Sequence, residues 1–172
     1  MTLLIAYEVG YTMSLESQKE AARKKSLGEL GELFAIKTLV DEEYDKIRNL
    51  NDDVMNTAFA DIYCEKDGKC YVVSVKARNK FQKNGQLNSQ YKLGTNAYEK
   101  ARRTAEHYNA EAYWMAIQFD KHDYSVYFGS LDCLEGKNAI PVKKCEEGKI
   151  GNILVYKKPH YFDFDFYENQ KD

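Results

Sequence analysis

Three side chains of chemical interest lie on either side of one turn signal: Asp61, Ser74 and Lys76. A carboxylate is a hard oxygen ligand of the kind that Mg²⁺ prefers. A lysine close to a cation can have its pKa lowered enough to act as a base. Glu32, in an earlier segment of helical periodicity, adds a second carboxylate. Two carboxylates and an amine brought together in this way would suit metal-assisted hydrolysis.

Two strands joined by a tight turn must position these side chains. We expect a strand over about residues 59–64 and a return strand over 70–77, with the Asp67-Gly68 turn signal between them. Side chains alternate along a strand, so Ser74 and Lys76 project from one face. The opposite face carries Tyr71, Val73 and Val75.

The second carboxylate depends on a helix, which the pattern predicts over residues 17–41 as one long helix or two consecutive ones. The capping-box spacing occurs at 17–20 and again at 26–29. Glu29 and Glu32 are three residues apart and therefore share a neighbouring face. The alternatives are a solvated position on the helix face for Glu32 and a capping role for Glu29.

The remaining pattern predicts a helix and four more strands around the hairpin. An alanine stripe indicates a helix over 95–108 that lies on the sheet. The strands are expected at 44–50, 112–119, 124–131 and 153–156, and residues 78–92 are expected to be a loop. This order of elements predicts an α/β domain.

Length and composition favour one ordinary globular domain. The chain has 172 residues, and we expect an N-terminal leader or extension at 1–16 and a single domain at 17–172. The formal net charge of -2 gives no overall attraction to polyanions, so contact with nucleic acid requires a local basic patch. No apolar run is long enough to span a bilayer, which predicts a cytoplasmic protein. The four cysteines form no C-x-x-C pair, so reduced thiols are expected in place of a zinc site.

Three short segments together resemble the PD-(D/E)XK nuclease superfamily. They are Gly31-Glu32-Leu33-Phe34-Ala35, Phe59-Ala60-Asp61-Ile62 and Val72-Val73-Ser74-Val75-Lys76-Ala77-Arg78. The nearest likeness is to the Holliday-junction-resolvase-like and restriction-enzyme branches, over about residues 26–118. The resemblance implies a restriction-endonuclease-like α/β fold, in which helices flank a central mixed β-sheet.

The resemblance also implies roles for individual residues. Asp61 and the Val75 carbonyl would bind Mg²⁺ or Mn²⁺, Glu32 would contribute from the helix, and Lys76 would orient or activate the attacking water. Ser74 stands where the family has an acid, and it is a poor ligand for Mg²⁺. Glu99 is the candidate for supplying the missing carboxylate.

The implied function is metal-dependent DNA endonuclease activity, with DNA as the partner and a dimer as the expected assembly. One alternative is a catalytically impaired member of the superfamily that binds nucleic acid or a partner protein. A chance match in an unrelated α/β domain is the other.

A basic, amide-rich segment follows the second strand and could form the edge that contacts DNA. Cations suit phosphates, and amides reach phosphates or base edges. The residues expected to bind are Arg78, Lys80, Lys83, Gln86 and Gln90. The alternative is a solvated, mobile loop. Near the C-terminus, residues 161–167 alternate aromatic and acidic side chains, which predicts an edge strand or a surface for self-association.

Overall fold

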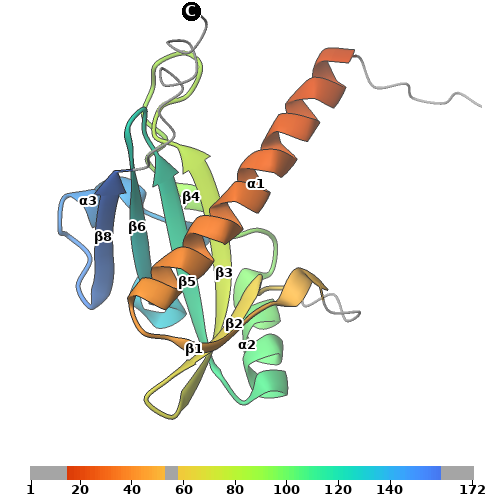
Figure 1. Cartoon of the computed structure of the whole chain (residues 1–172), viewed down its shortest axis with the longest axis vertical. Helices are drawn as coiled ribbons and strands as arrows, with labels where there is room; N and C mark the ends of the chain where they lie inside the picture. The colour runs from red at the N-terminus through yellow and green to blue at the C-terminus, as the bar shows by residue number, and fades with distance from the viewer. Residues whose placement is uncertain (1–14, 53–57, 160–172) are drawn as a thin grey trace, which may run out of the picture.

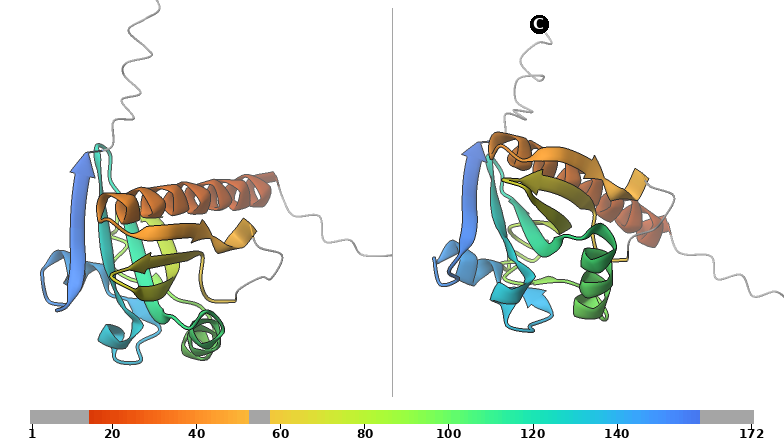
Figure 2. Two further views of the ribbon diagram at one scale, coloured as in Figure 1. Left: turned by 60° about the horizontal axis from the view of Figure 1, so that its bottom comes forward. Right: turned by 90° about the horizontal axis from the view of Figure 1, so that it is seen from below.

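A mixed β-sheet with helices on both faces forms the core of the protein (Figures 1 and 2). The computed structural model describes residues 15–52 and 58–159. Its six-stranded sheet has the order β1-β2-β3-β5-β6-β8, and a second sheet pairs β4 with β7. The predicted architecture, a central mixed sheet flanked by helices, is confirmed.

The strands are β1 (Asp45–Asn49), β2 (Ile62–Lys66), β3 (Lys69–Asn79), β4 (Tyr91–Lys92), β5 (Glu111–Phe119), β6 (Asp123–Ser130), β7 (Ala139–Ile140) and β8 (Ile153–Pro159). The helices are α1 (Leu15–Asp41), α2 (Ala97–Tyr108) and α3 (Val142–Glu146), with single 3-10 turns η1 (Leu50–Asp52) and η2 (Leu131–Leu134). In the described part of the chain, no helix combines the length and apolar character needed to cross a membrane. All four cysteines are free thiols, as expected.

Each face of the sheet has its own apolar layer. On one face α1 buries Ala35 and Leu39 against alternate residues of β3 and β5. On the other face α2 buries Ala97 and Ala101, which confirms the predicted alanine stripe. β3 and β5 are parallel, and α2 forms the crossover that parallel neighbours require.

Of the two alternatives expected from the sequence, one long helix or two consecutive ones, the structure has one continuous helix, α1. Neither expected capping box caps it. The helix already includes Leu15, so Ser17 is not its N-cap, and Ser26 lies in its middle. Glu29 lies 3.9 Å from the Lys25 ammonium one turn earlier, and it caps nothing. Within a helix a Ser-x-x-Glu spacing only places two side chains on neighbouring turns.

Gly31 brings α1 close to the sheet. A Cβ added at Gly31 would lie 2.3 Å from the Ala77 Cβ, a distance that real Cβ atoms do not tolerate. Gly28, one turn earlier, has no atom within 4 Å of an added Cβ. The bare backbone at Gly31 therefore lets the helix rest on β3 and sets the height of Glu32 above the sheet.

The predicted hairpin is confirmed as β2 and β3. Asp67 and Gly68 form its two-residue turn, with φ of 51° and 76° respectively. Positive φ at both positions is the type I′ geometry that matches the twist of the strands. The strand begins at Ile62 and not at 59, so Asp61 immediately precedes β2.

The sequence pattern predicts a loop over residues 78–92, but the two ends of this segment belong to strands. β3 continues through Arg78 and Asn79 because β5 runs beside it as far as Phe119. β4 then takes Tyr91 and Lys92. In the same way, β8 extends three residues beyond the expected 153–156, while α2 begins at Ala97 and not at 95.

The two terminal predictions fall largely or wholly beyond this part of the chain. The expected leader, 1–16, precedes it except for Leu15 and Glu16, which belong to α1. The aromatic and acidic run 161–167 lies outside the described residues.

Candidate functional site

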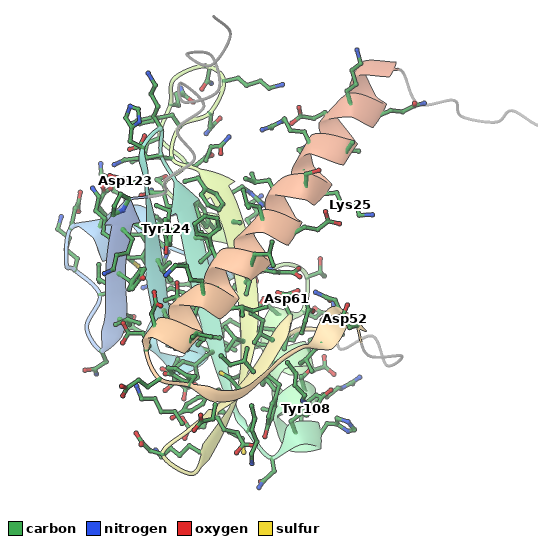
Figure 3. All side chains as sticks on the ribbon, in the orientation of Figure 1. Lys25, Asp52, Asp61, Tyr108, Asp123 and Tyr124 are labelled. Atoms are coloured by element: carbon green, nitrogen blue, oxygen red, sulfur yellow. The ribbon has the colours of Figure 1, made fainter. Side chains whose placement is uncertain are left out.

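Glu32 and Asp61, 29 positions apart in the sequence, line one open hollow beside α1. The hollow has a volume of about 580 Å³. Lys25, Asp52 and Asp61 lie along the same side of α1 (Figure 3). The full lining is Lys25, Glu29, Glu32, Leu33, Ile36, Asn49, Asn51, Asp52 and Asp61.

Asp61 is held by backbone hydrogen bonds on both sides. Its N–H donates to the Val73 carbonyl at 2.9 Å, and its own carbonyl accepts the Leu50 N–H at 2.8 Å. The carboxylate oxygen Oδ2 accepts the Val75 N–H at 2.7 Å. The Asp61 side chain thus accepts the Val75 N–H of β3 in place of a backbone carbonyl, one residue before β2 begins.

The surroundings of Asp61 shift the pKa of its carboxyl group in two opposite directions. Burial raises the pKa of Asp61, while the positive charge of Lys76 and the hydrogen bonds from Val75 and Asn51 oppose the rise. The net pKa is raised. The carboxyl is therefore partly desolvated and lies within electrostatic reach of the one lysine expected to act with it.

Two asparagines tether Glu32. The Asn49 side-chain amide donates to Oε2 at 3.1 Å, and the Asn51 amide donates to Oε1 at 3.1 Å. Burial raises the pKa of Glu32 against these bonds, and the charge of Asp61 adds to the rise. Because Asn51 also hydrogen-bonds Asp61, it bridges the two carboxyl groups.

No sequence signal pointed to Asn49, the last residue of β1, or to Asn51 in the turn η1 that follows it. Their role follows from the antiparallel pairing of β1 with β2, in which Asn49 lies opposite Ile62. Only that register brings the end of β1 beside Asp61.

Val75 contacts Asp61 through its N–H, Lys76 acts on Asp61 electrostatically, and Ser74 faces the interior. Neither Val75 nor Lys76 belongs to the lining of the hollow, and Lys76 shares the strand face of Ser74. In a strand the N–H and C=O of one residue point to the same side, so the Val75 carbonyl leaves β3 on the side of Asp61. Lys76 is partly buried. Ser74 is 1% exposed, alternates with the α1-side residues Val73 and Val75, and does not line the hollow.

The structure does not bring Glu99 to the hollow. It lies on α2, is exposed, and forms an ion pair with Arg103 one turn later. Within residues 15–52 and 58–159, no three acidic, histidine or cysteine side chains are grouped closely enough to hold a metal ion. Mg²⁺ commonly takes only one or two protein carboxylates and keeps several waters. Glu32, Asp61 and the Val75 carbonyl fit that smaller ligand set.

The expected DNA-contacting residues lie at the far end of β3, and their surroundings differ. Lys80 is occupied by Glu146 at 3.0 Å and Asp120 at 3.6 Å, and its side chain is only 20% exposed. Lys83 is 80% exposed and pairs with Glu20 of α1 at 3.0 Å. Arg78, Gln86 and Gln90 are exposed.

Neither a protein-family model nor a curated protein sequence matches this chain. Among solved structures, the chain is similar to the Holliday junction resolvase Hjc from the archaeal hyperthermophile Archaeoglobus fulgidus. The TM-score is 0.49 and the sequence identity 18%, over 66% of this chain and 88% of the resolvase.

Proposed function

We propose that this protein is a metal-dependent DNA endonuclease whose working residues are Glu32, Asp61 and Lys76. The observation that carries the proposal is the meeting of two carboxyl groups from separate elements in one hollow, with Asn51 between them. Two acids that face each other repel, and a divalent cation between them relieves the repulsion. Lys76 adds an amine within electrostatic reach of Asp61.

Each neighbouring group has a definite task in this proposal. The Val75 N–H fixes the rotation of the Asp61 carboxylate, and Asn49 and Asn51 fix that of Glu32. Glu32, Asp61 and the Val75 carbonyl would hold Mg²⁺ or Mn²⁺. When bound, the cation supplies charge compensation for the phosphate and a more acidic water. Lys76 would orient that water or the scissile phosphate.

The experiment is a nicking assay with supercoiled plasmid and with labelled duplex, branched and single-stranded DNA, in Mg²⁺ or Mn²⁺ and in EDTA. Cleavage should need the metal and should fall at least about 100-fold in Asp61→Ala, because a lost ligand removes several kcal/mol of charge stabilisation. Glu32→Gln and Lys76→Ala should also lose most of the activity. Glu106→Gln, which removes an exposed acid on α2, is the control that keeps it. Metal-independent cleavage, or full activity in Asp61→Ala, would contradict the proposal.

The buried hydroxyl of Ser74 favours a second candidate, a protein that binds nucleic acid without cutting it. Ser74 takes the place of the acid that the nuclease superfamily uses, and it lies away from the hollow. DNA binding with no cleavage in either metal would support this alternative. The expected homodimer stays a prediction, which light scattering on the purified chain would test.

A further inference from the structure

A second hollow lies on the opposite flank of α1, and its walls are basic. Positions 20, 23, 24 and 27 of the helix face this groove, whereas 25, 29, 32 and 36 face the carboxylate hollow. At about 100° per residue these two sets point to opposite sides. The groove has a volume of about 810 Å³. Its full lining is Glu20, Arg23, Lys24, Leu27, Arg78, Asn79, Phe81, Gln82, Lys83, Asn84 and Asn88.

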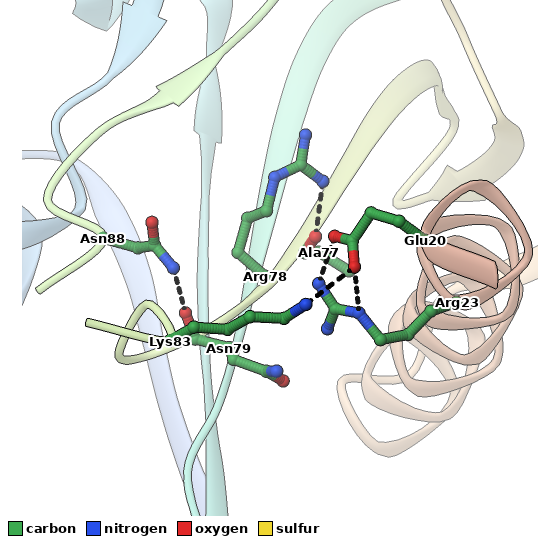
Figure 4. A network of polar contacts seen from close by, with 7 residues as sticks. All are labelled: Glu20, Arg23, Ala77, Arg78, Asn79, Lys83 and Asn88. Carbon is green, nitrogen blue, oxygen red and sulfur yellow. Dashed lines mark hydrogen bonds and ion pairs between the residues drawn. The ribbon is translucent and has the colours of Figure 1, made fainter. Parts of the chain in front are cut away.

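Glu20 holds two cations of the groove together (Figure 4). Arg23 donates to both of its carboxylate oxygens, at 2.8 and 3.2 Å, and the Lys83 ammonium donates to Oε2 at 3.0 Å. These bonds lower the pKa of Glu20 to about 2, so it stays ionised. A bidentate arginine and a lysine around one oxyanion also form the arrangement that binds a phosphate.

The opposite wall is a turn with its own hydrogen bonds. The Gln82 N–H donates to the Gln86 carbonyl at 2.7 Å, and the Asn88 N–H donates to the Lys80 carbonyl at 2.9 Å. The Asn88 side chain also donates to the Asn79 carbonyl at 2.7 Å. These three bonds close the turn without any bound ligand.

This turn presents one aromatic ring to solvent. Phe81 is 50% exposed although its neighbours are hydrogen-bonded, and it lines the groove beside amide side chains. Exposed aromatic rings next to cations form the stacking platforms of single-strand binding proteins. A duplex keeps its bases stacked on each other, so only an unpaired base could use the ring.

We infer that this groove binds a nucleic-acid strand at an unpaired nucleotide, with the base on Phe81 and a phosphate between Arg23 and Lys83. Glu20 holds the phosphate position until the strand displaces it. This inference rests on the proposed function and names the substrate class, a strand with unpaired nucleotides next to the cleavage site. Arg23 and Glu32 are nine residues apart on α1, a rise of about 14 Å, so the nucleotide in the groove is not the one that is cut.

The test measures binding by fluorescence anisotropy in EDTA, with the full chain and labelled single-stranded or fully duplex DNA. Phe81→Ala should weaken single-strand binding about fivefold or more and leave duplex binding unchanged, because the lost contact is base stacking. Lys83→Ala should weaken both and reduce the salt slope by about one. Equal losses for single strand and duplex in Phe81→Ala would overturn the assignment.

Glu20→Gln tests the displaced acid. Single-strand affinity should rise about threefold, the scale of an exposed ion pair. The matched control is Glu106→Gln, which also removes one acid paired with an arginine, Arg102, on a different helix. Equal gains in the two variants would show a general charge effect and overturn the inference. Competition by polyglutamate as strong as that by single-stranded DNA would also overturn it, since it would indicate an acidic protein as the partner.

The two proposals can fail separately. Binding in EDTA does not depend on cleavage, so Asp61→Ala should bind single-stranded DNA as the wild type does. If the groove variants had no effect while Asp61→Ala abolished nicking, the groove inference alone would fall. If the groove variants behaved as expected while no metal supported cleavage, only the endonuclease proposal would fall.

Discussion

The two flanks of α1 differ in how their acidic side chains are bound: by neutral hydrogen-bond donors on one flank and by cations on the other. On one flank Glu32 and Asp61 are partly buried and are held by neutral donors, the Asn51 amide and the Val75 N–H. On the other flank Glu20 and Lys83 meet with their charges already paired. Glu32 and Asp61 form no ion pair, and only the more distant charge of Lys76 acts on Asp61, so this flank favours a cation. In the groove Glu20 already pairs with Arg23 and Lys83, so a second anion must displace Glu20 to bind there. One helix thus separates a region suited to metal from one suited to phosphate.

The largest expected effect is a loss of cleavage on one flank of α1 that leaves DNA binding, the property of the other flank, intact. Asp61→Ala should reduce cleavage at least about 100-fold with binding unchanged. Arg23→Ala should weaken binding and reduce the salt slope by about one, yet leave the single-turnover rate at saturating protein unchanged. A drop in the saturated rate of Arg23→Ala would show that the two regions act as one site.

The close contact between α1 and β3 can be tested by substituting the two glycines of the helix, Gly28 and Gly31. Gly31→Ala should destabilise the fold by about 2 kcal/mol, because the added methyl overlaps Ala77 in a packed contact. Gly28→Ala is the matched control and should stabilise by about 0.5–1 kcal/mol through helix propensity alone. Urea unfolding measures both, and equal shifts would contradict the close approach of α1 to β3.

Cleavage by the proposed site can be reduced without removing either carboxylate. Asn51→Ala takes away the amide that bridges Glu32 and Asp61, and cleavage should fall about 10-fold, as for other groups that orient metal ligands. Raising the Mn²⁺ concentration should recover part of the loss. An unchanged rate and metal requirement would remove Asn51 from the proposed site.

The smallest effect distinguishes two lysines that look alike in the sequence. Lys80→Ala should leave DNA affinity unchanged, since Glu146 and Asp120 already occupy that ammonium, and should cost about 1 kcal/mol of stability. Lys83→Ala should do the reverse, with little change in stability. Fluorescence anisotropy measures DNA affinity and urea unfolding measures stability in the two variants. A loss of DNA affinity in Lys80→Ala would contradict the separate roles of Lys80 and Lys83.

How far the sequence could predict the fold depended on the range of each interaction. The Asp67-Gly68 turn and the alanine stripe of α2 are local signals, and both predicted structure that is present. The length of β3 was missed because its last residues, Arg78 and Asn79, owe their strand conformation to β5, whose sequence lies 40 positions further on.

The same limit applies to the candidate site. Glu32, Asp61 and Lys76 could be selected by residue type, but the bridge through Asn51 depends on how β1 pairs with β2. The expected binding role of Lys80 could not be judged from its neighbours, because its partner Glu146 is 66 positions away. Ser74 could be recognised in the sequence as a serine two positions before Lys76, whereas its burial could not.

The fixation of α1 gives it the mechanics of a cantilever. Its C-terminal end is anchored by Ala35 and Leu39 in the core and by the hydrogen bond from the Tyr156 hydroxyl to Asp41, while the turns from Ser17 to Lys25 project over the surface. Amide hydrogen exchange should therefore be slow near the anchor and grow faster toward the projecting end. A strand bound in the groove would contact these projecting turns, and amide exchange over them should then become slower.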